Sequence, residues 1–78
     1  MPRITPIDWR TLVHIFELDG FIQSRVKASH ISMTKAGIKR PVVIPKYNEV
    51  GLDIIMSNMR TAGMSRERYF ELLHRCQN

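Results

Sequence analysis

The sequence predicts an α+β fold in which two helices pack on one face of a three-stranded antiparallel sheet. Two segments with helical spacing of apolar residues flank a central stretch of short alternating segments that are joined by turns. The predicted order is α-β-β-β-α with a short extra C-terminal helix. A chain of 78 residues buries one small core, so we expect a single domain over residues 1–78. Both helices then share one sheet face, and the other face stays largely open.

The first helix is expected to start at Thr5, which is a favourable N-cap. Pro6 suits the first helical position, and Asp8 completes a capping box with Thr5. Gly20 is the expected end of the helix. The residues that recur at helical spacing, and that predict its buried face, are Trp9, Leu12, Val13 and Phe16.

The central part of the chain predicts an antiparallel meander. Its three strands are expected in residues 21–26, 30–35 and 40–44. A short turn, Lys27-Ala28-Ser29, joins the first two strands, and Gly37 supplies the positive φ expected at the tip of the second hairpin. Pro41 and Pro45 bracket the third strand, which indicates strand ends or an edge strand, since proline cannot donate to a ladder.

The C-terminal part predicts two more helices. Asn48 is the candidate cap of a helix over residues 50–62, and Gly63 is its expected stop. The apolar stripe of this helix is expected to comprise Leu52, Ile55, Met56 and Met59. Ser65 then caps a last short helix, and the residues on the apolar side of that helix are Tyr69, Phe70, Leu72 and Leu73.

Charge and cysteine content narrow the class of protein. The 12 Lys and Arg residues outnumber the 7 Asp and Glu residues, so the chain carries about +5 and favours nucleic acid, an acidic protein or an anionic membrane surface as its partner. Cys76 is the only cysteine, which excludes an intramolecular disulfide and a cysteine-based metal framework. No apolar run suits a membrane span or a signal peptide, and we expect a cytoplasmic protein.

The stretch from Arg25 to Met33 carries the most suggestive chemistry. Read by strand parity, Ile31 and Met33 face the core, whereas His30 lies on the open sheet face close to Arg25 and Lys27. An imidazole beside cations is suited to acid–base chemistry on an anion such as a phosphodiester. A surface histidine in an ordinary strand is the alternative interpretation of the same spacing.

A metal site is not expected, because the three histidines fall on three different predicted elements. None of His14, His30 and His74 forms an i, i+4 pair with another, and none has a cysteine partner. We therefore expect no cofactor.

Four short motifs resemble the HicA family, also called YcfA-like: toxins of HicA–HicB toxin–antitoxin modules. The resemblance runs from about Trp9 to Leu73. The matching pieces are Gly20-Phe21; Arg25-Val26-Lys27-Ala28-Ser29-His30; Val42-Val43-Ile44-Pro45; and Ala62-Gly63-Met64-Ser65 with Tyr69 or Phe70 and Leu72-Leu73. The α-β-β-β-α order is similar to the double-stranded-RNA-binding fold, whose members bind RNA by shape and backbone contacts.

The resemblance implies an mRNA interferase, a metal-independent endoribonuclease neutralised by a HicB-like antitoxin. The family's catalytic histidine corresponds to His30. Such an enzyme needs a base for the 2′-hydroxyl proton, cations for the charged phosphorane and an acid for the leaving oxygen. The expected RNA-binding residues are Arg25, Lys27, Ser29, Lys39 and Arg40.

The chain departs from the family at several positions. Ala28 stands where the family has glycine, Ile31 where a second histidine is frequent, and Lys46-Tyr47 where His-Pro is frequent. Two alternatives therefore stay open beside the enzyme: a small RNA-binding domain without chemistry, and a degenerate toxin that acts only as the partner of an antitoxin. We expect the free protein to be a monomer.

Overall fold

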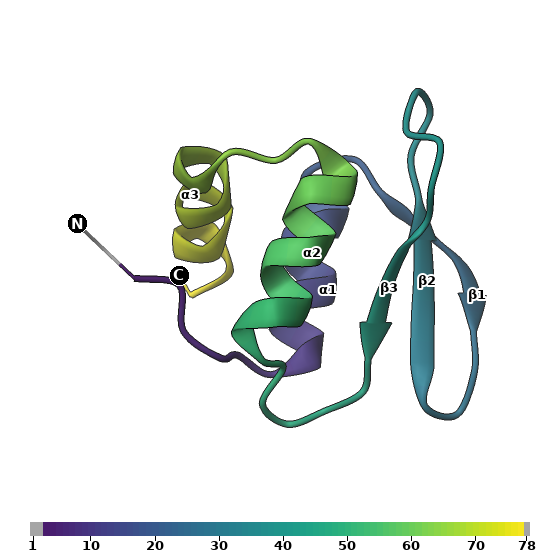
Figure 1. Ribbon diagram of the computed structural model, residues 1–78, viewed down its shortest axis with the longest axis horizontal. Helices are drawn as coiled ribbons and strands as arrows, with labels where there is room; N and C mark the ends of the chain where they lie inside the picture. Colours follow the sequence, from purple (N-terminus) through teal and green to yellow (C-terminus); the bar gives the residue numbers. More distant parts are fainter. Residues whose placement is uncertain (1–2, 78) are drawn as a thin grey trace.

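The computed structural model describes residues 3–77 and confirms the predicted fold class. Its order is α-β-β-β-α-α (Figure 1). The elements are α1 (Trp9–Leu18), β1 (Ile22–Val26), β2 (His30–Thr34), β3 (Val42–Pro45), α2 (Leu52–Ala62) and α3 (Arg66–Cys76). The resemblance to the double-stranded-RNA-binding fold stays a prediction.

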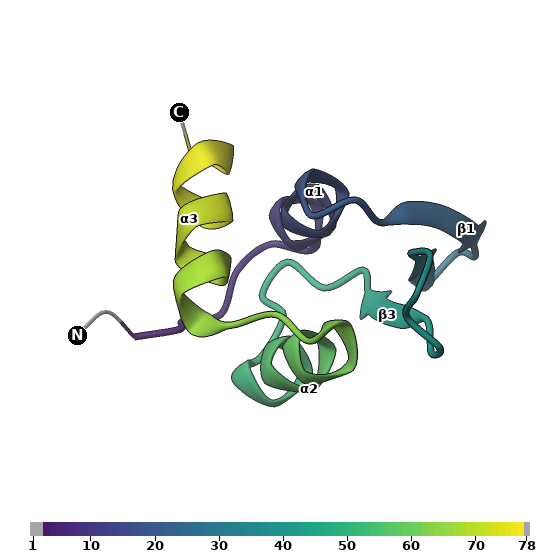
Figure 2. The same cartoon turned by 90° about the horizontal axis from the view of Figure 1, so that it is seen from above.

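The molecule is built in layers. The sheet has the antiparallel order β1-β2-β3, so β1 and β3 form its edges. Helices α1 and α2 lie side by side against one face and contact β3, while α3 packs on α1 on the side away from the sheet (Figure 2). Strand β1 lies farthest from the helices, and all five of its residues are exposed.

The helix α3 differs from the short helix that we expected. It has 11 residues, as many as α2. Ser65 caps it as predicted, because its hydroxyl oxygen accepts a hydrogen bond from the Arg68 N–H at 3.1 Å. Tyr69 and Leu72 of α3 are fully buried, so this helix contributes a substantial part of the core.

The core lies between the sheet and the helices and continues to α3. Strand β2 contributes Ile31 and Met33, as the alternation predicted, and β3 contributes Val42 and Ile44. The helical residues that are buried with them are Leu12, Val13, Ile15, Phe16, Ile55, Met59, Ala62, Tyr69 and Leu72. Apolar burial on this side of the sheet leaves the opposite face for polar side chains.

The predicted start of the first helix was wrong by several residues. Helix α1 begins at Trp9, and Asp8 is its N-cap, accepting a hydrogen bond from the Arg10 N–H at 2.8 Å. An antiparallel bridge holds Ile7 against Val50, with N···O distances of 2.7 and 3.4 Å. Because this bridge keeps Ile7 extended, the helix cannot start earlier.

The predicted start and buried face of the second helix also need correction. Its N-cap is Gly51 rather than Asn48, because the preceding residue, Val50, is held in the bridge. Leu52 and Met56 are 43% and 46% exposed, so they do not belong to the core stripe. The buried stripe of α2 comprises Ile55, Asn58, Met59 and Ala62.

The strand ends and turns follow the prediction more closely. Strand β3 starts at Val42, two residues later than expected, and β2 ends at Thr34. Gly37 has φ +88° at the tip of the second hairpin, and Gly63 has φ +67° at the C-terminal end of α2. Both glycines occupy the left-handed conformation for which they were assigned.

Candidate nucleic-acid site

The pairing of β1 with β2 determines which side chains share the open sheet face. A bulge lies between Gln23 and Arg25, and after it Arg25 stands opposite Ser32 and Val26 opposite Ile31. Residues that stand opposite each other point to the same face. Since Ile31 is buried, Val26 lies on the helix side and Arg25 lies on the open face.

Ser24 is the extra residue of this bulge, and it is bonded in place. Its hydroxyl donates a hydrogen bond to the carbonyl oxygen of Ser32 at 3.2 Å. Without the extra residue, Arg25 would stand opposite Ile31 and would point to the helix side. The bulge therefore turns Arg25, and with it Lys27, onto the open face.

A tight turn brings Lys27 directly opposite His30. The Lys27 N–H donates to the His30 carbonyl oxygen at 2.9 Å, and only Ala28 and Ser29 lie between them. From the other side, the Lys46 N–H donates to the Ser29 carbonyl oxygen at 3.0 Å. Backbone hydrogen bonds from Lys27, at the end of β1, and from Lys46, after β3, therefore hold the turn in place.

The imidazole of His30 has one hydrogen-bond partner in this turn. The Ser29 hydroxyl oxygen lies 2.9 Å from Nδ1 of His30. In the tautomer that carries its proton on Nδ1, the ring donates to Ser29 and the lone pair of Nε2 is free to accept a proton. His30 is exposed, so a substrate can reach it.

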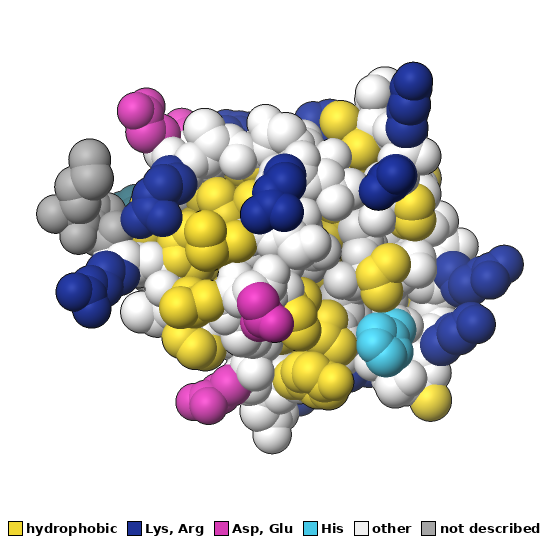
Figure 3. Space-filling model, in the orientation of Figure 1, with side chains coloured by type: hydrophobic (Ala, Val, Ile, Leu, Met, Phe, Trp, Pro, Cys, Tyr) yellow, Lys and Arg dark blue, Asp and Glu magenta, His cyan; other side chains and the backbone are white. Residues whose placement is uncertain are grey.

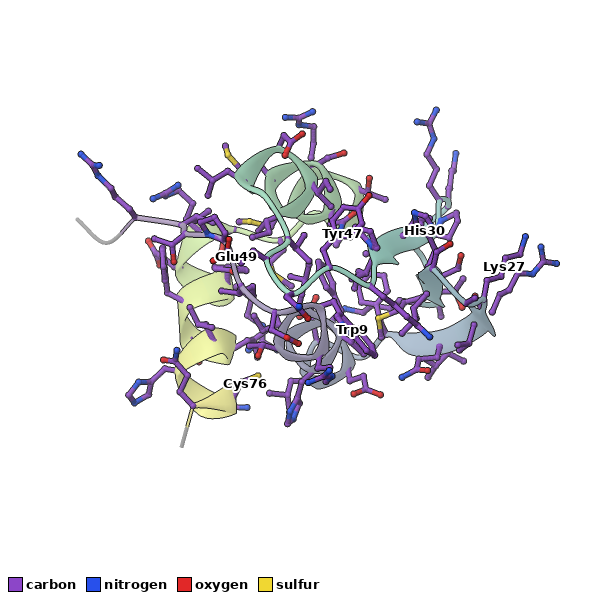
Figure 4. The ribbon with its side chains drawn as sticks, turned by 90° about the horizontal axis from the view of Figure 1, so that it is seen from below. Trp9, Lys27, His30, Tyr47, Glu49 and Cys76 are labelled. Atoms are coloured by element: carbon purple, nitrogen blue, oxygen red, sulfur yellow. The ribbon has the colours of Figure 1, made fainter. Side chains whose placement is uncertain are left out.

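The surroundings of His30 are cationic. Figure 4 shows His30 between Tyr47 and Lys27, and Figure 3 shows a histidine beside Lys and Arg side chains on the strand side of the molecule. Within residues 3–77, neither Arg25 nor Lys27 forms an ion pair with a carboxylate. Both cations are exposed and available to an anion.

A shallow depression of about 320 Å³ continues from Arg25 along the open face. It is lined by Ser24, Arg25, Ser32, Thr34 and Pro41. The hydroxyl groups of Ser24, Ser32 and Thr34 were not among the predicted RNA contacts. The polar alternation of β2 did indicate that Ser32 and Thr34 share the open face with His30. Hydroxyls beside a guanidinium suit hydrogen bonds to phosphate and ribose oxygens.

Lys39 and Arg40 do not join His30. They lie in the exposed loop between β2 and β3, at the end of β2 opposite to His30. The four residue steps from His30 to Thr34 alone span about 13 Å at the usual rise of a strand. The predicted contacts therefore divide into Arg25, Lys27 and Ser29 near His30, and two cations at the far end of the sheet.

An aromatic–cationic group lies near the same end of the sheet as His30. The Lys46 ammonium and the Arg10 guanidinium each lie 5.4 Å from the centre of the Trp9 ring. The Trp9 N–H donates to the Tyr47 carbonyl oxygen at 3.1 Å. The Lys46-Tyr47 segment, one of the departures from the family pattern, is thus anchored to the start of α1.

The remaining reactive side chains form no second site. In the described part of the chain, no three His, Cys, Asp or Glu side chains are placed to hold a metal ion. Burial raises the pKa of the Cys76 thiol, which disfavours the nucleophilic thiolate. No helix among the described residues has the length and apolarity needed to cross a membrane.

Comparison with known proteins identifies the family. The family model described as HicA toxin of bacterial toxin-antitoxin matches residues 9–64, which include both hairpins, His30 and all of α2. No curated protein and no solved structure matches the chain. Because the matched residues make up well over half of the chain, this protein belongs to the HicA toxin family of bacterial toxin–antitoxin modules.

Proposed function

We propose that this toxin is a metal-independent ribonuclease that cleaves mRNA through His30. The observation that carries the proposal is the 2.9 Å contact between the Ser29 hydroxyl and His30 Nδ1 on an open, cationic sheet face. In the tautomer protonated on Nδ1, this contact orients the ring and leaves the lone pair of Nε2 free. The family supplies the toxin role, and the net charge of +5 suits an RNA substrate.

RNA carries its own nucleophile, which limits what the protein must provide. Nε2 of His30 takes the proton of the 2′-hydroxyl, whose oxygen forms a bond to the adjacent phosphorus. The bond from phosphorus to the 5′-oxygen breaks, and that oxygen leaves with a proton from the imidazolium or from water. The products are a 2′,3′-cyclic phosphate and a 5′-hydroxyl end.

The cations have distinct tasks in this proposal. Lys27 stands opposite His30 and offsets the charge that develops on the phosphorane oxygens. Arg25 and the hydroxyls of the depression bind the neighbouring backbone. Lys39 and Arg40, at the far end of β2, hold a more distant part of the RNA.

The test compares the wild-type protein with His30→Gln on a mixed-sequence RNA, with EDTA present throughout. We expect the wild type to cut and the variant to bind the RNA with the same Kd without cutting it. His14→Gln is the matched control, because His14 is an exposed histidine on α1. It should cut at the wild-type rate.

The other outcomes point to the alternatives. If the wild type binds RNA and does not cut it, the chain is an RNA-binding domain or a toxin that has lost its chemistry. Cleavage by His30→Gln at the wild-type rate would move the reaction to another residue. The partners that we propose are mRNA and a HicB-like antitoxin, and the proposed location is the cytoplasm.

A further inference from the structure

A second polar groove lies outside the cationic face, between the free edge of β3 and helix α2. It has a volume of about 430 Å³ and is lined by Pro41, Val43, Asp53, Ile54, Ser57, Asn58 and Thr61. Its lining includes Asp53 and no Lys or Arg, in contrast to the open sheet face. The proposed mechanism uses none of these residues.

The edge of β3 offers backbone groups to this groove. The Lys46 N–H bonds to the Ser29 carbonyl oxygen, and bonded and non-bonded pairs alternate along an antiparallel ladder. Ile44, opposite Ile31, therefore bonds to β2, whereas Val43 directs its N–H and C=O outward. Pro41 and Pro45 cannot donate, so Val43 supplies the single N–H of this edge.

Helix α2 adds an unusual polar group at the same groove. Asn58 is buried, with an exposed fraction of 7%. Its Nδ2 has no hydrogen-bond partner among residues 3–77. A buried amide that lacks an acceptor destabilises a fold unless a ligand or a partner supplies one. The position belongs to the buried i, i+3, i+4, i+7 stripe of α2, where an apolar residue would be expected.

These groups together match the backbone of an extended peptide. A strand added beside β3, at the usual spacing of about 4.8 Å, would accept from the Val43 N–H and donate to the Val43 C=O. Helix α2 runs antiparallel to β3 (Figure 1), so the added strand would lie beside the α2 residues that line the groove. Nδ2 of Asn58 is closed to solvent in this structure, and a rotation of the Asn58 side chain would let it donate to a carbonyl of the added strand. A nucleic-acid backbone accepts hydrogen bonds but has few donors, and Asp53 would repel its phosphates.

We propose that this groove binds an extended segment of the antitoxin, which adds a fourth strand to the sheet beside β3. The charged residues at the two ends of the groove indicate the direction in which the segment binds. Lys39 and Arg40 precede Pro41 at one end of the groove, and Asp53 stands at the other. The bound segment therefore places an acidic side chain near Arg40 and a hydroxyl or basic side chain near Asp53.

The inference rests on the proposed antitoxin partner and is independent of RNA cleavage. The probe is the purified protein encoded by the reading frame adjacent to the gene for this toxin. In its complex with the intact toxin, we expect the Val43 amide to be protected from hydrogen exchange. Filtered NMR spectra should also show contacts between a strand of the partner and the Hα atoms of Val42 and Ile44, which point outward on this edge. The Val26 amide at the opposite edge serves as the reference in the same spectra.

Two substitutions test the contacts separately. Val43→Pro removes the free N–H, and Asn58→Leu replaces the buried donor by an apolar side chain of similar size. Each should weaken the complex about tenfold, the factor that corresponds to the loss of one good hydrogen bond. Val43→Thr keeps the N–H and should bind as the wild type does. All three variants should retain the wild-type RNA-cleavage rate. None should lower the unfolding midpoint, and Asn58→Leu should raise it, because it removes a buried amide that has no partner among residues 3–77.

Each remaining result overturns a definite part of the inference. A complex in which Val43 exchanges freely, and which Val43→Pro and Asn58→Leu do not weaken, rules out the added strand. Shifts of the Val43 and Asn58 signals on addition of RNA alone would assign the groove to RNA instead. The absence of any complex with the wild-type toxin would remove the antitoxin proposal itself.

Discussion

The Ser29 hydroxyl oxygen lies 2.9 Å from Nδ1 of His30, within a two-residue turn that brings Lys27 opposite the histidine. Adjacent residues in a strand normally point to opposite faces, so this contact depends on Ser29 lying in the turn rather than in β2. The hydrogen bond holds the ring in one orientation without occupying Nε2. Ser29 is therefore a positioning residue in the proposed mechanism.

Ser29→Ala should lower kcat for RNA cleavage by about three- to tenfold, the range expected for one lost hydrogen bond. KM should stay at the wild-type value, since the ring is still present and the cations are untouched. Ser29→Thr keeps the hydroxyl and should restore most of the rate. A variant that raises KM and leaves kcat unchanged would instead make Ser29 a simple RNA contact.

Lys27 and Lys39 should differ in what they do to cleavage, because they lie at opposite ends of β2. Lys27→Ala should reduce the rate at saturating RNA about tenfold or more, since a cation beside the reacting phosphate stabilises the transition state. Lys39→Ala should weaken RNA binding a few-fold at low salt and leave the saturated rate unchanged. Single-turnover cleavage over a range of RNA concentrations separates the two effects, and equal losses of rate would contradict the proposed placement.

The order of the elements could be predicted from the sequence because the signals for it are local. Helical spacing, the turn at Gly37 and the stops at Gly20 and Gly63 each depend on a few neighbouring residues. The helix starts could not be predicted in the same way. The bridge between Ile7 and Val50 joins residues that are distant in the chain, and it overrides the capping signals at Thr5 and Asn48.

The buried face of α2 was predicted in part, and the error has a physical source. Asn58 is polar, so a search for apolar residues passes over it and selects Leu52 and Met56 instead. The true stripe is recognised only when Asn58 is counted as a core position beside Ile55 and Met59. Asn58, the residue that hid the pattern, also carries a buried Nδ2 without a hydrogen-bond partner among residues 3–77.

The position of His30 on the open sheet face could be predicted from the sequence. Which cations lie beside it could not. Parity alone placed His30 on the face opposite Ile31, and the sheet confirms that placement. The bulge at Ser24, which decides the face of Arg25, depends on pairing with β2 and has no clear local signal. The position of Lys39 also depends on hairpin length, which the predicted strand ends had wrong.

Asp19 should be a stabilising residue, because it joins three elements. Its carboxylate accepts from the Arg68 guanidinium of α3 at 3.1 Å and lies 3.7 Å from the Lys35 ammonium that follows β2. Its side chain is 13% exposed, whereas that of Glu71, which also pairs with Arg68, is 52% exposed. In urea unfolding, Asp19→Asn should lower the midpoint more than Glu71→Gln, because exposed pairs contribute little. Equal midpoints for the two variants would show that the Asp19 pairs contribute no more than the exposed one.

Tyr69 should make the protein sensitive to alkali. Burial, with a smaller contribution from Cys76, raises the pKa of Tyr69 to about 12 from its ordinary value of 10. Between pH 10 and 12 the unfolded chain loses this proton and the folded chain keeps it, so the free energy of unfolding falls as the pH rises. Below pH 10 the contribution is constant.

Tyr69→Phe should remove this part of the alkaline loss, which amounts to at most about 3 kcal/mol for two pH units. The Tyr69 hydroxyl is buried without a partner among residues 3–77, so at pH 7 the variant should be as stable as the wild type or slightly more stable. Urea unfolding of both proteins at pH 7, 10 and 11.5 measures the difference. Parallel stability curves for the two proteins would show that Tyr69 is not the group responsible.

Ala28 is the departure from the family pattern that lies in the turn before His30, and we expect it to be harmless. Within residues 3–77, no residue other than glycine has a positive φ, so Ala28 occupies a conformation that alanine adopts without strain. Ala28→Gly should therefore leave the RNA-cleavage rate unchanged and lower the free energy of unfolding by about 0.4–1 kcal/mol, because glycine gives the unfolded chain more freedom. Gly37→Ala is the reverse exchange. Gly37 has φ +88°, and a Cβ added there would meet open space, so this variant should destabilise the protein through backbone strain of about 1–2 kcal/mol. A faster Ala28→Gly enzyme would mean that the turn before His30 needs the family's glycine during catalysis.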